Sequence, residues 1–181
     1  MTDSPIQSDF AAARLYLCGG SHNRMIESMR EARKLLQNRF SKLKEFPNKP
    51  PEMYSEPSHG TLLDWCRLDK GPTIAWGIYF NREGSDYWAG LDPPVRFREG
   101  VFLEIEFKRV VQRPLRNGFG DWHFPVDRVL QRNEIFGVSK MAALSDFGED
   151  FGPEFSTWVA DSFAEGQALI SAVEGSPRRQ K

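Results

Sequence analysis

The stretch VFLEIEFK, residues 101–108, alternates between apolar side chains at its odd positions and one phenylalanine followed by charged side chains at its even positions. Successive residues of a β-strand point to opposite faces, so the stretch predicts a strand with one apolar face and one face that carries Glu104, Glu106 and Lys108. Antiparallel sheets commonly have one buried and one solvated face. The stretch therefore predicts an antiparallel sheet that is covered on one side.

Further strand patterns lie on both sides of this stretch. Apolar and aromatic runs at 73–80, 86–91 and 101–111 are separated by turn residues, including a glycine-containing turn at 81–84. We expect these three runs to form an antiparallel meander, with a possible fourth strand at 134–138.

Two amphipathic patterns predict the helices that cover the sheet. Apolar residues recur every three or four positions between His22 and Phe46, and again between Pro153 and Val173. The stripe in the first pattern consists of Met25, Met29, Ala32, Leu36, Phe40 and Leu43. The predicted fold class is α+β: an antiparallel three- to four-stranded meander packed against a long N-terminal helix and a C-terminal helix.

Length and composition predict a single domain. The chain has 181 residues, of which 40% are hydrophobic, 27% charged and 13% aromatic, and these are the proportions of a folded globular protein. We expect residues 1–181 to comprise a basic amphipathic helix at 22–46, a proline-rich linker or arm at 47–60, an α+β core at 61–174 and a disordered basic tail at 175–181.

The cysteines and the hydropathy pattern predict a cytoplasmic protein. Cys18 and Cys66 lie far apart and have neither a disulfide framework nor metal spacing, which suits a reducing compartment. Residues 1–10 lack the basic start and apolar run of a secretory signal. No stretch approaches the roughly 18 apolar residues of a membrane span, so we expect no membrane partner.

Charge is unevenly distributed although the net charge is only −1. Residues 22–46 hold seven basic and three acidic residues, whereas residues 140–174 hold one basic and seven acidic residues. One interpretation is that the two helices lie side by side and attract each other. The other is a basic face, centred on Arg30, Arg33 and Lys34, that binds an acidic partner or a second copy of the chain, giving a dimer.

Aromatic side chains gather at the run 73–80. Trp76, Ile78 and Phe80 share one face of this strand, whereas Tyr79 lies on the other face beside small residues. Tyr79 is therefore a candidate stacking platform for a base, a sugar or a peptide side chain. The alternative is that these aromatic side chains pack beneath the helices.

Arginines are concentrated in the loop that follows the central strand. Arg113 and Arg116 offer guanidinium forks suited to phosphates or carboxylates. Acidic residues are interleaved with them, among them Asp121 and Glu134. Binding of an external anion and internal salt bridges both remain open.

Glu106 and Lys108 form an acid-x-lysine motif on the wet face of the strand. Their side chains project side by side, so the carboxylate can hold a divalent metal while the lysine positions a water or a phosphate. A further acid from the preceding strand, Asp86 or Asp92, would complete the metal site. The alternative is an ordinary solvated strand face, which needs no cofactor.

The order of a helix, three meandering strands, a helix and a strand, together with this motif, resembles the PD-(D/E)XK nuclease family. The resemblance covers residues 22–138 and implies Mg or Mn, held by Asp86 or Asp92 with Glu106, and a catalytic role for Glu106 and Lys108. Glu27 or Glu31 would supply the auxiliary acid. The chain departs from the family pattern because Pro93 follows Asp92 instead of preceding it.

The sequence contains no Walker loop, GxGxxG, HExxH or GxSxG motif. This favours a non-catalytic intracellular binding protein that engages a macromolecular partner through its charged helices or its aromatic hairpin. A protein partner or self-association is expected, with nucleic acid as a further option. The alternative is a metal-dependent nuclease or a decayed relative acting on DNA or RNA, so whether the chain is an enzyme is left open.

Overall fold

In the part of the chain described by the computed structural model, helix α2 is followed by eight strands, a short 3-10 helix and then helix α4. That part comprises residues 21–48, 52–56, 59–69, 71–81, 90–95, 97–114, 119–125, 130, 133–148 and 150–174. The elements are α2 (Ser21–Arg39), β1 (Leu43–Lys44), β2 (Glu52–Glu56), β3 (His59–Leu68), β4 (Thr73–Asn81), β5 (Leu91–Asp92), β6 (Glu99–Gln112), β7 (Trp122–Pro125), β8 (Glu134–Ala143), a 3-10 helix (Leu144–Asp146) and α4 (Phe151–Glu174).

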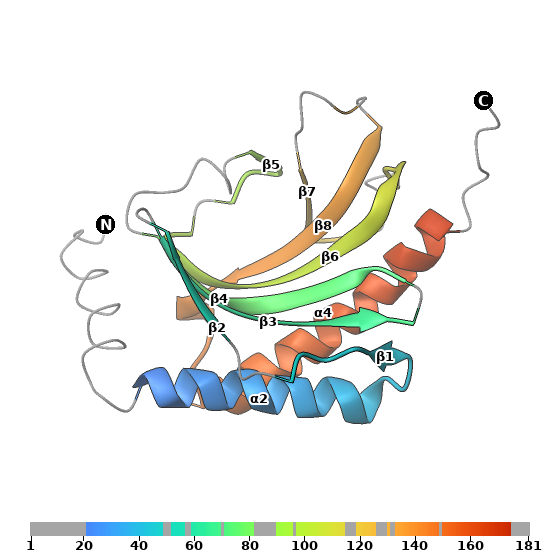
Figure 1. The fold of residues 1–181 in the computed structure, drawn as a ribbon. Helices are drawn as coiled ribbons and strands as arrows, with labels where there is room; N and C mark the ends of the chain where they lie inside the picture. The colour runs from blue at the N-terminus through green and yellow to red at the C-terminus, as the bar shows by residue number, and fades with distance from the viewer. Residues whose placement is uncertain are drawn as a thin grey trace.

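The strands form one antiparallel sheet. Seven of them follow the order β1-β3-β4-β6-β8-β7-β5, and β2 pairs with β3 beside this path. Figure 1 shows a curved sheet with α2 and α4 both packed on its convex side. We call that side the helix face and the opposite side the open face. The predicted α+β class is confirmed, but the sheet has eight strands within the described residues instead of three or four.

The predicted meander of runs 73–80, 86–91 and 101–111 is wrong. β4 pairs directly with β6, and the short β5 pairs with β7 near the far edge. Residues 82–89, which hold the predicted turn and most of the middle run, lie outside the described residues. Alternation identifies strands, but strand neighbours depend on long-range pairing that the local pattern does not contain.

The sequence analysis did not predict strand β3, because a charged residue occupies one of the core positions of this strand. Asp64 is 1% exposed on the helix face, between Leu62 and Cys66. Arg33 of α2 donates two parallel hydrogen bonds to the Asp64 carboxylate, from Nε at 2.8 Å and from a terminal nitrogen at 2.5 Å. The pairing satisfies a charge that would otherwise be costly to bury, and it hides the strand's apolar periodicity.

The N-terminal helix is shorter than predicted. Met25, Met29, Ala32 and Leu36 form its buried stripe as expected, but α2 ends at Arg39 instead of continuing to Phe46. Leu43 is buried as well, although it reaches the core from β1. The apolar spacing therefore extends beyond the end of the helix, because Leu43 is buried from the strand that follows.

The proline-rich segment at 47–60 is not wholly irregular. β2 occupies Glu52–Glu56 and pairs with β3, whose first residue is His59. In the sequence the prolines at 47, 50, 51 and 57 lie outside the β2 residues, so the strand itself contains no proline. The predicted tail at 175–181 lies outside the described residues.

The two helices pack against each other, as one interpretation of their charges expects. Arg39 of α2 donates to Asp161 of α4 at 2.5 Å. Close approach elsewhere depends on small residues, since a Cβ built on Gly152 would lie 3.2 Å from the Ser28 hydroxyl. Gly166 allows α4 to touch the sheet, because a Cβ there would lie 2.6 Å from the Ile105 side chain.

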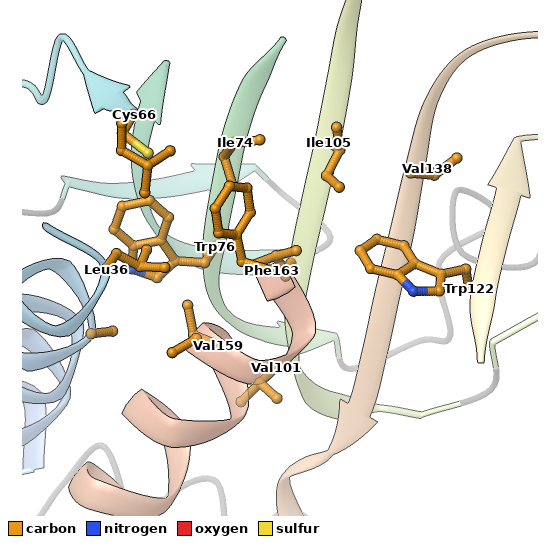
Figure 2. Close-up of a cluster of buried hydrophobic side chains, with 14 of the residues drawn as sticks. Leu36, Cys66, Ile74, Trp76, Val101, Ile105, Trp122, Val138, Val159 and Phe163 are labelled. Atoms are coloured by element: carbon orange, nitrogen blue, oxygen red, sulfur yellow. The ribbon is translucent and has the colours of Figure 1, made fainter. Parts of the chain in front are cut away.

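The main core fills the space between the helices and the sheet. Figure 2 shows Leu36 of α2, Trp76 of β4, Trp122 of β7 and Phe163 of α4 converging in this layer. A second, smaller cluster lies on the open face and consists of Tyr79, Leu91, Val95, Phe102 and Met141. The helix face is therefore mostly apolar, with paired charges such as Asp64 among its core residues, whereas the open face is apolar over only part of its area.

Candidate functional site

The open face is divided into two halves by the register of its strands. Residues paired across the sheet on this face form rows, and two rows near one end hold Leu63, Gly77, Phe102 and Met141, then Tyr79 and Gly100. The next two rows hold Trp65, Ala75, Glu104, Ser139 and His123, then Arg67, Thr73, Glu106 and Gly137. We call these the apolar half and the polar half of the open face.

In the apolar half of the open face, aromatic rings pack directly over glycines of the neighbouring strands. A Cβ on Gly77 would lie 2.8 Å from the Phe102 ring, and a Cβ on Gly100 would lie 2.8 Å from the Tyr79 ring. Tyr79 is 0% exposed, and burial raises the pKa of its phenol. The predicted stacking platform at Tyr79 is therefore wrong, because no face of this ring is left for a ligand.

The polar half contains a row of hydrogen-bonding groups on three adjacent strands. Glu104 of β6 pairs with Ser139 of β8, and Ser139 pairs with His123 of β7. Neighbouring strands are about 4.8 Å apart, so the Cα atoms of Glu104 and His123 are about 10 Å apart. Ser139 and His123 are 4% and 8% exposed, whereas Glu104 is half-buried.

The carboxyl group of Glu104 has an unusually high pKa. Burial raises its pKa to about 7, and the neighbouring Glu106 carboxylate adds to the effect. One carboxyl oxygen of Glu104 lies 3.9 Å from the position of a Cβ built on Gly137, which faces Glu106 across the strands, so the carboxyl extends diagonally towards β8 and the Glu106 row. Both physical causes disfavour the charged form.

His123 forms the buried end of the row. Burial lowers the pKa of its imidazole, whereas the backbone groups of Ser139 and Asp121 and the carboxylates of Asp121 and Asp92 act in the opposite direction. Its Nδ1 atom has no hydrogen-bond partner among the described residues. A buried polar atom without a partner is uncommon and is frequently satisfied by a water, an ion or a ligand.

Glu106 lies on the open face opposite Thr73 and Gly137, and Lys108 follows in the irregular stretch of β6 between Glu106 and Val111; both are exposed. Asp92, another predicted metal ligand, does not join them. Asp92 pairs across strands with Phe124, whose ring belongs to the helix-side core, and Asp86 lies outside the described residues. The described residues contain no group of three or more histidine, cysteine, aspartate or glutamate side chains that could hold a metal.

The predicted basic face of the N-terminal helix is divided in the structure. Arg33 turns inward to Asp64 and also donates to the Pro47 carbonyl at 2.9 Å. Arg30 and Lys34 are exposed, but the exposed Glu27 and Glu31 lie on the same outer side of α2. Part of the excess positive charge of this segment is compensated by carboxylates outside it, since Arg33 pairs with Asp64 and Arg39 with Asp161.

The arginine loop contributes an internal contact. Arg113 donates to Asp92 at 3.1 Å, and its guanidinium lies 4.5 Å from the centre of the Phe124 ring. Arg116 lies outside the described residues. The salt-bridge alternative therefore holds for Arg113.

The sequence analysis missed Ser139, His123 and Trp65 as members of one site. Each lies on a different strand, and only the register places them on one row with Glu104. The pattern at 101–108 showed that Glu104 shares a face with Glu106, which was the one available signal. Cys66 is not a candidate nucleophile, since burial and the nearby Asp64 raise the pKa of its thiol to about 12.

Comparisons with other proteins do not assign this chain to a family. No protein-family model matches the chain, and comparison with curated proteins gives no match. No solved structure matches it either. Among the described residues, no helix is long and apolar enough to cross a membrane.

Proposed function

We propose that the protein is a non-catalytic binding protein that engages a protein partner through the polar half of its open face. The observation that carries this proposal is the contrast between the two sides of the sheet. Both described helices cover the helix face, and the charged groups there are paired, as in Arg33 with Asp64 and Lys140 with Glu165. The polar half instead presents Glu104 and Glu106 without an ion-pair partner among the described residues.

The chemistry of the polar half supports recognition by hydrogen bonds and charge. Glu106 and Lys108 are exposed, and Trp65 and Thr73 are half-buried beside them. Interfaces use aromatic side chains and charged groups of this kind to fix orientation and specificity. The charged outer side of α2 is a weaker candidate, because its basic and acidic residues alternate.

The experiment that tests this function is selection of binding peptides from a displayed random library. The library is selected on the wild-type protein and then screened against two double variants, Glu104→Gln/Glu106→Gln and Arg30→Glu/Lys34→Glu. We expect enriched peptides to bind the wild type and the helix variant and to lose affinity for the open-face variant. Circular dichroism of each variant checks that the fold is retained.

The opposite pattern would place the binding surface on α2. Peptides that lose affinity only for the Arg30→Glu/Lys34→Glu variant contradict the open-face proposal. Binding of single-stranded DNA or RNA oligonucleotides, measured by fluorescence anisotropy, would indicate a nucleic-acid partner instead. A second copy of the chain as partner would be seen as a concentration-dependent change in mass by light scattering.

The nuclease alternative stays a prediction. Glu106 and Lys108 are both exposed on β6, but Asp92 is engaged by Arg113. The cytoplasmic location expected from the cysteines is likewise part of the proposal.

A further inference from the structure

Strands β6 and β8 continue past the point where β4 begins. The outermost residue pair between β4 and β6 joins Thr73 to Glu106, whereas β6 runs on to Gln112. Among the described residues only β8 accompanies this part of β6, through pairs at its last two residues. Figure 1 shows the ends of β6 and β8 extending together beyond β3 and β4. We call residues 108–112 and 134–136 the ribbon.

The backbone of the ribbon is irregular where it leaves the sheet. Between the pair of Glu106 and Gly137 and the pair of Val111 and Ile135, β6 residues 107–110 face a single residue of β8. A residue supplies one N–H and one C=O, so β8 cannot pair with the backbone of all these residues. On the side of β4, no strand among the described residues pairs with β6 beyond Glu106. The ribbon therefore has a free edge, and such edges readily accept another strand.

The ribbon also carries exposed apolar side chains. Among the described residues, three large hydrophobic side chains are exposed, and two of them are Val110 and Phe136, at 45% and 40%. Each is next in sequence to a member of the pair of Val111 and Ile135, so both lie at the same level of the ribbon. The third, Phe97, precedes the opposite end of β6. Exposed apolar side chains that gather at one place favour an interaction surface.

The charged groups of the ribbon favour one kind of partner. Lys108 and Arg109 are exposed, and neither forms a salt bridge among the described residues. A second copy of the chain would bring its own Lys108 and Arg109 to this short edge, where like charges repel. A phosphate backbone would meet the carboxylates of Glu104 and Glu106 beside the ribbon. An acidic protein segment is attracted by both cations, and its apolar side chains can pack on the two exposed hydrophobic side chains.

We propose that the ribbon binds an extended acidic segment of a partner protein, which adds as a strand to the free edge of β6 beyond Thr73. Main-chain hydrogen bonds to residues 108–112 hold the segment, and its side chains give selectivity. Its carboxylates pair with Lys108 and Arg109. The inference rests on the proposed function, because the ribbon adjoins the polar half at Glu106, and it gives the partner's chemistry.

The test uses a fluorescein-labelled hexapeptide of alternating valine and aspartate, with a hexapeptide of alternating valine and lysine as its counterpart. Six residues match Phe107–Gln112, the part of β6 beyond Glu106. We expect saturable binding of the acidic peptide in fluorescence anisotropy and none of the basic peptide. Lys108→Glu/Arg109→Glu should weaken the binding about tenfold or more, because two attractions become repulsions.

Two control variants separate the ribbon from general surface effects, and circular dichroism checks the fold of every variant. Arg30→Glu/Lys34→Glu makes the same change in charge on α2 and should leave the affinity unchanged. Phe136→Ala should weaken the acidic peptide about threefold through lost apolar contact. Phe97→Ala removes a ring of nearly equal exposure, 39%, at the other end of β6 and should have no effect.

Strand addition has a signature that side-chain contacts alone do not produce. An added strand pairs with an edge through the N–H and C=O groups of alternate residues. N-methylation of one alternate set of amides in the acidic peptide should therefore abolish binding, whereas methylation of the other set should preserve it.

Equal binding of the acidic and basic peptides, or equal binding of the two methylated peptides, would overturn strand addition at the ribbon. Oligonucleotide binding that is lost in Lys108→Glu/Arg109→Glu, without binding of the acidic peptide, would overturn it in favour of nucleic acid. If library peptides require Glu104 and Glu106 but bind the Lys108→Glu/Arg109→Glu variant as well as the wild type, the proposed function stands and this inference fails. If the acidic peptide binds as expected while no library peptide depends on Glu104 and Glu106, the ribbon site stands and the polar half fails as the binding surface.

Discussion

Buried carboxylates are paired with a cation on one face of the sheet and lack such a pairing on the other face. On the helix face, Asp64 is almost fully buried and accepts hydrogen bonds from Arg33 and from the backbone N–H of Trp65. On the open face, Glu104 is half-buried and its nearest charged neighbour on the strand is another carboxylate. A charge that is paired in this way fixes how α2 sits on β3, whereas an unpaired charge leaves binding energy for another molecule.

Removing the carboxylate charge at Asp64 should have the largest effect on stability. Asp64→Asn leaves the Arg33 guanidinium, whose side chain is 17% exposed, without its counter-charge. We expect the free energy of unfolding to fall by about 3 kcal/mol, measured by urea denaturation.

Asp161→Asn is the matched control for this change. It breaks the Arg39–Asp161 pair, whose side chains are 46% and 54% exposed, and should cost less than about 1 kcal/mol. Equal losses for the two variants would show that the Arg33–Asp64 pair is no more important than a surface contact.

Glu104→Gln should stabilise the protein at alkaline pH. The folded state holds the Glu104 proton up to a pKa of about 7, whereas an ordinary glutamate has a pKa of 4.5. The wild type should therefore lose stability as the pH rises between these values, and the loss should persist at higher pH. Since Glu104 is only half-buried, we expect the variant to be more stable by about 1–2 kcal/mol at pH 8.

Thermal unfolding of both proteins from pH 5 to pH 8 measures this difference directly. His123 acts in the opposite direction, because its lowered pKa removes stability as the pH falls below 6.5. That contribution is common to both proteins and cancels in the comparison. A stability difference that does not change with pH would mean that Glu104 titrates normally.

The smallest expected effect is the heat of manganese binding. The structure leaves Glu106 apart from Asp92, so titration of chelator-treated protein with manganese should give no saturable heat. Glu106→Gln should behave as the wild type does. Saturable binding that disappears in this variant would favour the nuclease alternative and weaken the contrast drawn between the two faces.

Local patterns predicted the elements more reliably than their arrangement. The alternation at 101–108 placed Val101, Leu103, Ile105 and Phe107 on the buried face of β6. The helical spacing likewise identified Met25, Met29, Ala32 and Leu36 as buried positions of α2. These predictions hold because burial by one face of a strand or helix depends on the period of the sequence alone.

The candidate site was predicted less well for a physical reason. Glu106 and Lys108 could be placed on an exposed face because they share a strand with the pattern. Tyr79 shares that same open face but is buried by its packing over Gly100, which is 21 positions away in the sequence. Burial on this face depends on which strands pair, and alternation within one strand carries no such information.

The sequence by itself determined the α+β class, the apolar side of the central strand and the two amphipathic helices, because side-chain periodicity follows directly from backbone geometry. Only the tertiary structure decided that Arg33 serves the core, that β4 lies beside β6, and that His123 and Ser139 continue the row begun by Glu104. These features arise from contacts between distant segments, whose register is fixed by how all the apolar faces are buried together.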